Sequence, residues 1–370
     1  PDAGWDAWVS AYRGRAAARG ISAATLDSAF RGAGFLPEVI EKDRNQVEFR
    51  RSLEDYLAIA ASDERVALGR QEYAARGALL SAIESRHGVE GHVVAAFWGV
   101  ESFYGTRRGN VPVISALSTL AYEGRRAAMF ESQLDAALRI LQAGDVPAAR
   151  MTGSWAGAMG HTQFMPTSYL EYAVDFTGDG RRDIWGEDPA DALASTANYI
   201  ARAGWRHGLA WGQEVILPAG FDRTLLGRGR DREAGEWSRL GVRAARGALL
   251  SGSIIAPDAP AGPAFLLTRN FAVILRYNNS ESYGLGVGYL SDRIRGAGEL
   301  VTPFGPDATG LTRAERTELQ RLLTRGGFDT GGSDGVLGPK SEAAIRAFQQ
   351  ARGLAVTGRA SPELLRMLRG

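Results

Sequence analysis

The segment from Val93 to Tyr104 constrains the fold most, because its apolar side chains recur along one face of a helix. A spacing of i, i+4, i+7 and i+11 relates Val93, Phe97, Val100 and Tyr104, which predicts a buried helical stripe. Glu101 lies beside this stripe. A carboxyl group crowded by apolar surface loses hydration, so we expect a raised pKa and a retained proton. Taken alone, such a glutamate is more often solvated or salt-bridged.

Helical periodicity extends through most of the chain and predicts a mainly α protein. It covers residues 1–145, breaks at a Gly-rich loop near 152–165, and returns at 189–203. From about 213 to 270, short apolar runs alternate with Gly-, Pro- and Arg-rich turns, as small β-strands do. We therefore expect an α+β fold in which residues 1–302 form one domain with a small β-containing insertion.

A second, smaller domain is expected at the C-terminus. Residues 303–310 are rich in Gly and Pro and indicate a linker. Residues 311–370 contain three helical segments, which predicts a small bundle. Within them, residues 334–339 and 354–358 look like two copies of one turn, each of which opens a helix.

Charge and composition exclude several classes of function. A net charge of +1, from 43 basic and 42 acidic residues, argues against a nucleic-acid-binding protein, whose affinity depends on phosphate neutralisation. The absence of cysteine excludes disulfides and thiolate metal sites, and suits the oxidising periplasm. No apolar run is long enough to span a membrane. A signal or lipid anchor would lie upstream of Pro1.

Six segments of the sequence form a recognisable series: residues 100–105, 116–126, 154–160, 163–168, 197–205 and 270–280. In their residues and their order, these segments resemble the membrane-bound lytic transglycosylase B family of peptidoglycan-cleaving enzymes. The resemblance covers about residues 1–300. It implies a lysozyme-like helical catalytic domain in an exported, periplasmic protein. One departure is Gly124, where many relatives carry a bulkier residue.

The same resemblance assigns site residues by position. Glu101 matches the single catalytic acid of the family. Ser154 and Gln163 match polar residues that line the cleavage site, and Met159 lies in the same loop. The residues that match the aromatic and amide groups binding the sugar rings are Tyr199, Tyr277, Asn278 and Tyr283. Ordinary packing is the alternative for Tyr199 and Tyr283.

Most glycosidases use two carboxylates, and the sequence shows one convincing candidate, which agrees with the resemblance. The resemblance implies a lyase-type cleavage that needs no cofactor for its chemistry. Protonated Glu101 would donate to the oxygen between N-acetylmuramic acid and N-acetylglucosamine, while the acetamido oxygen of the substrate offsets charge at the anomeric carbon. Ionised Glu101 would then accept the proton of the C6 hydroxyl, which closes a 1,6-anhydro ring. The alternatives are a hydrolytic muramidase and a non-catalytic cell-wall-binding scaffold.

Residues 175–183 have the oxygen-bearing positions of an EF-hand loop. Positions 1, 3 and 5 are Asp175, Thr177 and Asp179, a glycine stands at position 6, and Arg181 at position 7 offers its carbonyl. The usual glutamate at position 12 is missing, and the resemblance makes Asp191 its replacement. This pattern predicts a structural Ca²⁺ or another hard cation. The alternative is an Asx-turn loop that its own backbone satisfies.

The C-terminal phrases at 319–323, 334–339 and 344–350 resemble the three-helix peptidoglycan-binding domain found on many cell-wall enzymes. The resemblance implies that peptidoglycan glycan strands are the partner of this module. A binding module joined to a catalyst raises the local substrate concentration, whereas a structural cap is the alternative. Proteins of cell-wall synthesis or division are further candidate partners.

Overall fold

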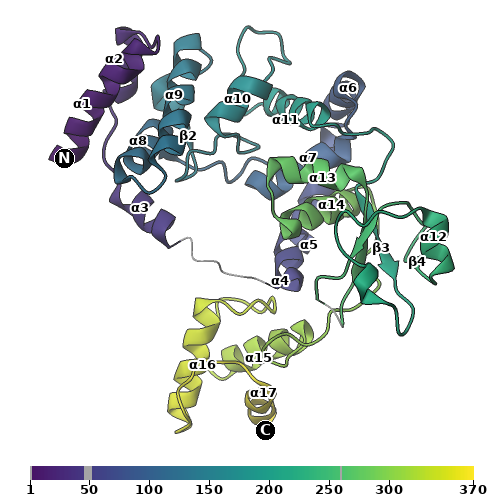
Figure 1. Cartoon of the computed structure of the whole chain (residues 1–370). Coiled ribbons are helices and arrows are strands. Elements are labelled where there is room, and N and C mark those ends of the chain that lie inside the picture. The colour runs from purple at the N-terminus through teal and green to yellow at the C-terminus, as the bar shows by residue number, and fades with distance from the viewer. Residues whose placement is uncertain (1, 46–51, 259–260) are drawn as a thin grey trace. The chain divides into compact units, whose positions relative to one another are not determined.

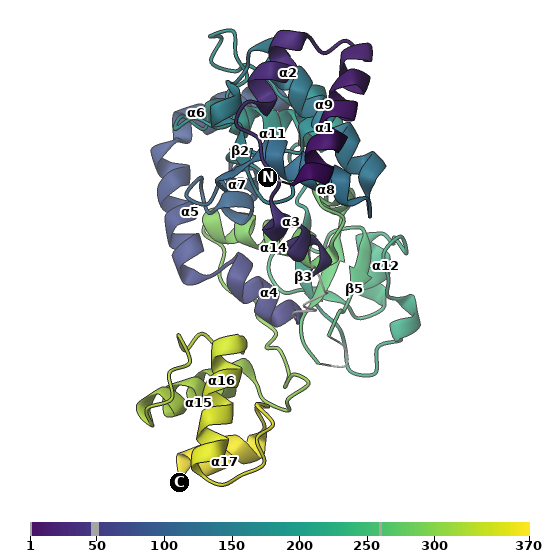
Figure 2. The same ribbon diagram turned by 90° about the vertical axis from the view of Figure 1, so that its left-hand side faces the viewer.

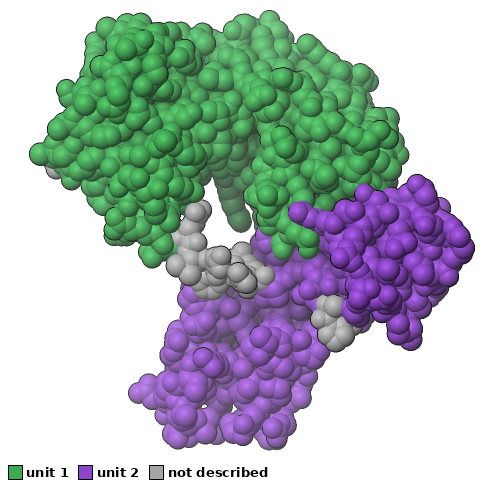
Figure 3. Space-filling view, in the orientation of Figure 1, with its two compact units in different colours: residues 1–50, 60–211, 268–298 green, residues 51–59, 212–267, 299–370 purple. Residues whose placement is uncertain are grey.

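The computed structural model describes residues 2–45, 52–258 and 261–370. The chain forms two compact units, coloured green and purple in Figure 3. Unit 1 comprises Pro1–Arg50, Ala60–Trp211 and Thr268–Gly298, and unit 2 comprises Arg51–Ile59, Gly212–Leu267 and Glu299–Gly370. These units divide the chain differently from the expected domains, because the β-containing insertion groups with the C-terminal module.

Unit 1 is helical, as Figure 1 shows. Its helices are α1 (Ala3–Ala18), α2 (Ala23–Phe30), α3 (Pro37–Arg44), α5 (Asp63–Ala75), α6 (Gly77–His87), α7 (Gly91–Ser102), α8 (Val113–Glu123), α9 (Ala127–Ala143), α10 (Pro166–Tyr172), α11 (Ala190–Arg202), α13 (Arg269–Tyr277) and α14 (Glu281–Ile294). A short antiparallel pair joins β1 (Val111–Pro112) to β2 (Thr152–Gly153). Side-chain oxygens of Ser22, Ser62 and Ser280 accept backbone N–H groups at helix starts, as N-caps do.

Helix α7 runs through the interior of unit 1 and packs against α5, α6, α11 and α14. Val93, Phe97 and Trp98 are buried, which confirms the expected apolar face. The predicted stripe is wrong at its end: Val100 is only half-buried, and α7 ends at Ser102, before Tyr104. The helix therefore terminates one residue after Glu101.

Unit 2 contains a four-stranded antiparallel sheet in the order β4-β3-β6-β5. The strands are β3 (Gly212–Ile216), β4 (Arg243–Ala244), β5 (Ser253–Ile255) and β6 (Ala264–Leu267), so strands are present where the short apolar runs predict them. Val215 is opposite Ala264, and Ile254 is opposite Leu266. Trp237 of α12 (Ala234–Arg239) is fully buried against this sheet.

Three helices make the C-terminal module: α15 (Arg313–Arg325), α16 (Pro339–Ala351) and α17 (Pro362–Arg369), which pack together in Figure 2. The predicted turn repeat has a structural counterpart. Gln320 Oε1 accepts the backbone N–H of Gly335 at 2.8 Å, and Gln349 Oε1 accepts that of Gly358 at 2.9 Å. In both copies a buried glutamine of one helix holds the turn before the next.

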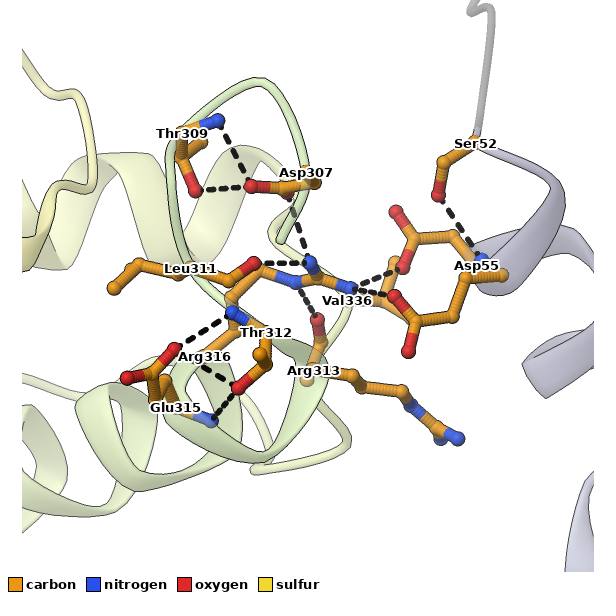
Figure 4. A network of polar contacts seen from close by, with 12 residues as sticks. Ser52, Asp55, Asp307, Thr309, Leu311, Thr312, Arg313, Glu315, Arg316 and Val336 are labelled. Atoms are coloured by element: carbon orange, nitrogen blue, oxygen red, sulfur yellow. Dashed lines mark hydrogen bonds and ion pairs between the residues drawn. The ribbon is translucent and has the colours of Figure 1, made fainter. Parts of the chain in front are cut away.

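Arg316 of α15 connects this module to the linker and to α4 (Leu53–Ala60). Its side chain is 1 % exposed and forms ion pairs with Glu54 at 3.2 Å, Asp55 at 2.9 Å and Asp307 at 2.9 Å (Figure 4). Asp307 also accepts the N–H of Thr309 at 2.8 Å. Side-chain contacts of Asp307 therefore hold the middle of the segment at 303–310, unlike a freely flexible linker.

No helix in the described part of the chain is both long and apolar enough to cross a bilayer.

Candidate active site

Glu101 stands in the last turn of α7, where its carboxyl group is surrounded by protein yet the residue keeps partial exposure. Burial raises the pKa of Glu101 to about 7, and a hydrogen bond from the hydroxyl of Tyr283 to Oε1 opposes this rise. Apolar surroundings disfavour the charged form, whereas a donated hydrogen bond favours it. Near neutral pH the carboxyl group can therefore either give or take a proton.

The turn after Glu101 has an unusual backbone. Phe103 and Tyr104 have φ angles of 51° and 57°, in the left-handed region that non-glycine residues seldom adopt. Tyr104 folds back over α5 and α7, and its hydroxyl donates to the carbonyl of Arg65 at 2.8 Å. A Cβ added at Gly69 would lie 2.1 Å from that hydroxyl. The buried ring and its hydrogen bond thus hold the strained turn that ends the helix.

The Gly-rich segment after β2 folds into a tight loop that contacts the turn after Glu101. Met159 and Phe164 exchange backbone hydrogen bonds of 2.8 and 2.9 Å. A Cβ at Gly160 would lie 2.2 Å from the carbonyl of Ile184, so glycine is required for this close approach. The hydroxyl of Ser102 donates to the carbonyl of His161, which fastens the loop to the end of α7.

Ser154 and Gln163 occur at the two ends of this loop, and both are half-buried. Ser154 Oγ accepts the N–H of Ala158 at 3.1 Å. Gln163 Nε2 donates to the carbonyls of Arg108 and Gly160 at 3.0 and 2.9 Å. Because both amide protons of Gln163 are used, Oε1 is the side-chain atom left to meet a ligand donor.

Met159 differs from its neighbours in the loop. Its side chain is fully buried in the hydrophobic core of unit 1. It therefore supports the loop from behind, and direct contact with a ligand, expected from its place in the sequence, does not fit its burial.

Two of the tyrosines expected at the site pack on Phe97, and the third packs on one of these two. The ring centroid of Phe97 lies 4.9 Å from that of Tyr277 and 6.4 Å from that of Tyr283, and Tyr199 lies 5.0 Å from Tyr277. The hydroxyl of Tyr277 donates to the carbonyl of Thr162 at 2.6 Å. Burial and the charge of Glu101 raise the pKa of Tyr277, so that hydroxyl stays protonated. Tyr277 and Tyr283 thus combine packing with proximity to Glu101, whereas Tyr199 is placed by packing on Tyr277.

The remaining expected residue, Asn278, is exposed at the C-terminal end of α13. The structure gives its side chain no contact with Glu101 among the residues it describes. Asn278 is placed near the site only through its neighbour in the chain, Tyr277, whose ring packs on Phe97.

His161 was missed by sequence reasoning. Its ring is buried, its Nδ1 accepts the indole N–H of Trp98 at 3.1 Å, and its Nε2 donates to the carbonyl of Gly186 at 2.7 Å. These partners fix the neutral tautomer, and burial lowers the pKa of His161, which favours the same form. The sequence offered one indication of this role: the chain has only four histidines, and His161 is the one that lies in the Gly-rich motif.

The cation loop brings three carboxylates together. One oxygen each of Asp175, Asp179 and Asp191 lies within 4.8 Å of the others. Asp191, in the first turn of α11, is 3 % exposed and accepts the N–H groups of Phe176 and Asp183, each at 2.9 Å. Burial raises the pKa of Asp191. Three carboxylates this close fit a hard cation, although N–H donors also satisfy some of their oxygens.

Comparison with known proteins identifies two modules. Residues 4–292 match the family described as transglycosylase SLT domain, and residues 312–368 match the putative peptidoglycan binding domain. Membrane-bound lytic murein transglycosylase B of Escherichia coli (strain K12) is 35% identical over 215 residues, which are 56% of this chain and 58% of that protein. This chain therefore spans under two thirds of that curated relative.

Solved structures extend the comparison. SltB3 from Pseudomonas aeruginosa, in complex with NAG-anhNAM-pentapeptide, is 47% identical, with a TM-score of 0.79 and 99% of each chain covered. Slt35 from Escherichia coli, in complex with calcium, is 26% identical, with a TM-score of 0.66 over 80% of this chain and 93% of that one.

Proposed function

Because this chain belongs to the family of transglycosylase SLT domains, we propose that it is a lytic transglycosylase of peptidoglycan. It cleaves the β-1,4 bond between N-acetylmuramic acid and N-acetylglucosamine and leaves 1,6-anhydro-N-acetylmuramic acid ends. The observation that carries the proposal is Glu101, whose pKa is raised to about 7 by burial while Tyr283 donates to its carboxylate.

In the first step protonated Glu101 donates its proton to the bridging oxygen, and the bond from that oxygen to the anomeric carbon breaks. The acetamido oxygen of the muramic acid offsets the positive charge that develops at this carbon. A pKa of about 7 keeps the proton available near neutral pH, as general acid catalysis requires.

In the second step ionised Glu101 accepts the proton of the C6 hydroxyl, whose oxygen bonds to the anomeric carbon and closes the anhydro ring. The hydrogen bond from Tyr283 favours the ionised form that exists between the two steps. Proton donor and proton acceptor are thus one group, and its own protonation is restored at the end.

The nearest alternative is a muramidase that uses water. Glycosidases of that kind place a second carboxylate across the cleft. Within the described ranges, no carboxylate hydrogen-bonds Glu101 or shifts its pKa. The products released from sacculi distinguish attack by the sugar's own hydroxyl from attack by water.

Sugar binding is proposed for Ser154, Gln163, Tyr199, Tyr277 and Asn278. Tyr283, also expected among these residues, is instead buried with its hydroxyl on Glu101. Amide and hydroxyl groups bond sugar hydroxyls and N-acetyl groups, and aromatic faces stack on sugar C–H surfaces. The free Oε1 of Gln163 suits an N-acetyl N–H.

We propose two accessory properties. Asp175, Thr177, Asp179 and Asp191, with the carbonyl of Arg181, hold a calcium ion that stabilises the loop before α11; a relative with 26% identity was solved in complex with calcium. The chemistry itself uses no cofactor. The module at 312–368 binds peptidoglycan in the periplasm, where proteins of cell-wall synthesis or division are candidate partners.

Mass spectrometry of the fragments released from purified sacculi tests the function. Anhydro-terminated muropeptides are the expected products. Reducing muramic acid ends would instead identify a muramidase, and no release would support a binding scaffold.

A further inference from the structure

A pocket of about 610 Å³ lies beside the turn that follows Glu101. It is lined mostly by the turn and the residues after it, together with Arg76, Trp98, His161 and Glu187. Neither Glu101 nor any of the residues expected to bind the sugar rings is among its described lining residues. The pocket therefore has no role in the two proton transfers.

The pocket is basic, because three guanidinium groups line it and Glu187 is the one acidic residue among its described lining residues. Aromatic rings and hydrogen bonds hold the guanidinium groups in place. Arg76 stands over Trp98 at 5.3 Å and bonds Glu72 at 2.9 Å, and Arg107 stands over Phe103 at 4.5 Å. Fixed guanidinium groups lose little conformational freedom on binding an anion.

The contacts of Arg108 indicate that the anion is a carboxylate. Its Nη1 donates to the carbonyls of Trp185 and Gly186 at 3.1 and 2.7 Å, while Nη2 donates to a carboxylate oxygen of Glu187 at 2.6 Å. The side chain of Glu187 is 93 % exposed, so a ligand carboxylate can replace it at little cost, since exposed ion pairs contribute little. Arg107 has no ion pair within residues 2–45, 52–258 and 261–370, and offers a second binding point.

We propose that this basic pocket binds a carboxylate of the peptide stem that peptidoglycan strands carry, so that the enzyme prefers strands with charged stems. The inference rests on the proposed function, which supplies the substrate class. The solved relative from Pseudomonas aeruginosa holds a sugar ligand bearing a pentapeptide, a chemistry that includes carboxylates. The pocket volume accommodates a piece of peptide rather than a single inorganic ion.

The test compares kcat/KM on peptidoglycan strands with free stem carboxylates and on the same strands after conversion of those carboxylates to amides. At low salt the wild type should prefer the free carboxylates by about 3- to 5-fold, and high salt should weaken this preference. Arg107→Gln should remove most of it. Glu187→Gln should increase it, because the competing carboxylate is gone.

Arg31→Gln is the matched control, since Arg31 is exposed directly after the end of α2 and its charge should not affect the preference. The inference is overturned if wild type cleaves both substrates equally well, or if Arg107→Gln lowers kcat/KM on both by the same factor. Failure of the proposed function is distinguishable, because wild type would then cleave neither substrate. In that case, the affinity of each variant for a disaccharide pentapeptide is measured. A lower affinity for Arg107→Gln than for Arg31→Gln still supports binding in the pocket, and equal affinities refute it.

Discussion

The hydroxyl of Tyr283 donates a hydrogen bond to Oε1 of Glu101, although the two residues are 182 positions apart in the chain. Glu101 belongs to α7 and Tyr283 to the first turn of α14, and these helices pack side by side in unit 1. The contact counters the burial that raises the pKa of the carboxyl group. It thereby sets the balance between the donor and acceptor forms of the proposed catalytic group.

Replacing the catalytic carboxyl group should abolish most activity. Glu101→Gln keeps the shape of the side chain but removes the titratable proton, so turnover of sacculi should fall by about 10²–10⁴-fold or more. Release of soluble fragments measures this. Glu41→Gln, at an exposed position of α3, is the control, and similar activity in the two variants would rule out the role of Glu101.

The pH profile should respond to Tyr283→Phe. Without the donated hydrogen bond the ionised form of Glu101 is less stable, so its pKa should rise above about 7. Since the first step needs the protonated form, the alkaline limb of kcat/KM should move to higher pH, while kcat falls because the acceptor form is weakened.

Tyr289→Phe lies on the same helix and provides the comparison, because its hydroxyl bonds Arg293 instead of Glu101. Its alkaline limb should coincide with that of the wild type. A Tyr283→Phe profile that also coincides would contradict the proposed influence of this hydroxyl.

Glu101→Gln should also stabilise the fold at alkaline pH. The folded-state pKa lies above the ordinary value of 4.5, so folding favours the protonated form and the cost of ionisation grows as pH rises from about 4.5 to about 7. A tenfold change in an equilibrium corresponds to about 1.4 kcal/mol, which over this range of pH gives at most about 3.5 kcal/mol. Denaturant unfolding of both proteins at pH 4 and pH 8 should show a gain only at the higher pH.

Calcium should raise the melting temperature of the wild-type protein. Free calcium at about 100 times its Kd would add about 2.7 kcal/mol. Asp179→Asn should reduce this gain, because it removes one of three clustered charges while Asp191 keeps its backbone hydrogen bonds. Asp231→Asn, outside the loop, should respond like the wild type. If millimolar calcium does not change the melting temperature, the loop is instead an Asx-turn loop that its own backbone satisfies.

Loss of Arg316 should destabilise unit 2. Arg316→Leu leaves Glu54, Asp55 and Asp307 without their shared cation, and breaking a buried ion pair costs about 3–5 kcal/mol. Arg321→Leu, at an exposed position of the same helix, should change the unfolding free energy by less than about 0.5 kcal/mol. Equal effects in chemical denaturation would show that the network contributes no stability.

Local spacing in the sequence predicted much of this protein. The apolar face of α7, the position of Glu101 beside it and the turn repeat of the C-terminal module follow from periodicities that near neighbours in the chain determine. The strands of unit 2 were expected, but their pairing order β4-β3-β6-β5 was not, because pairing depends on residues distant in the sequence.

The sequence by itself determined which helix carries the carboxyl group and which loop gathers the acidic oxygens, because such patterns recur within one or two turns of chain. Only the tertiary structure decided that Tyr283 bonds Glu101, that Tyr104 turns back to end α7, and that Met159 is fully buried. Each of these depends on desolvation and contacts supplied by segments far away in the chain, and those also set the pKa of a buried acid.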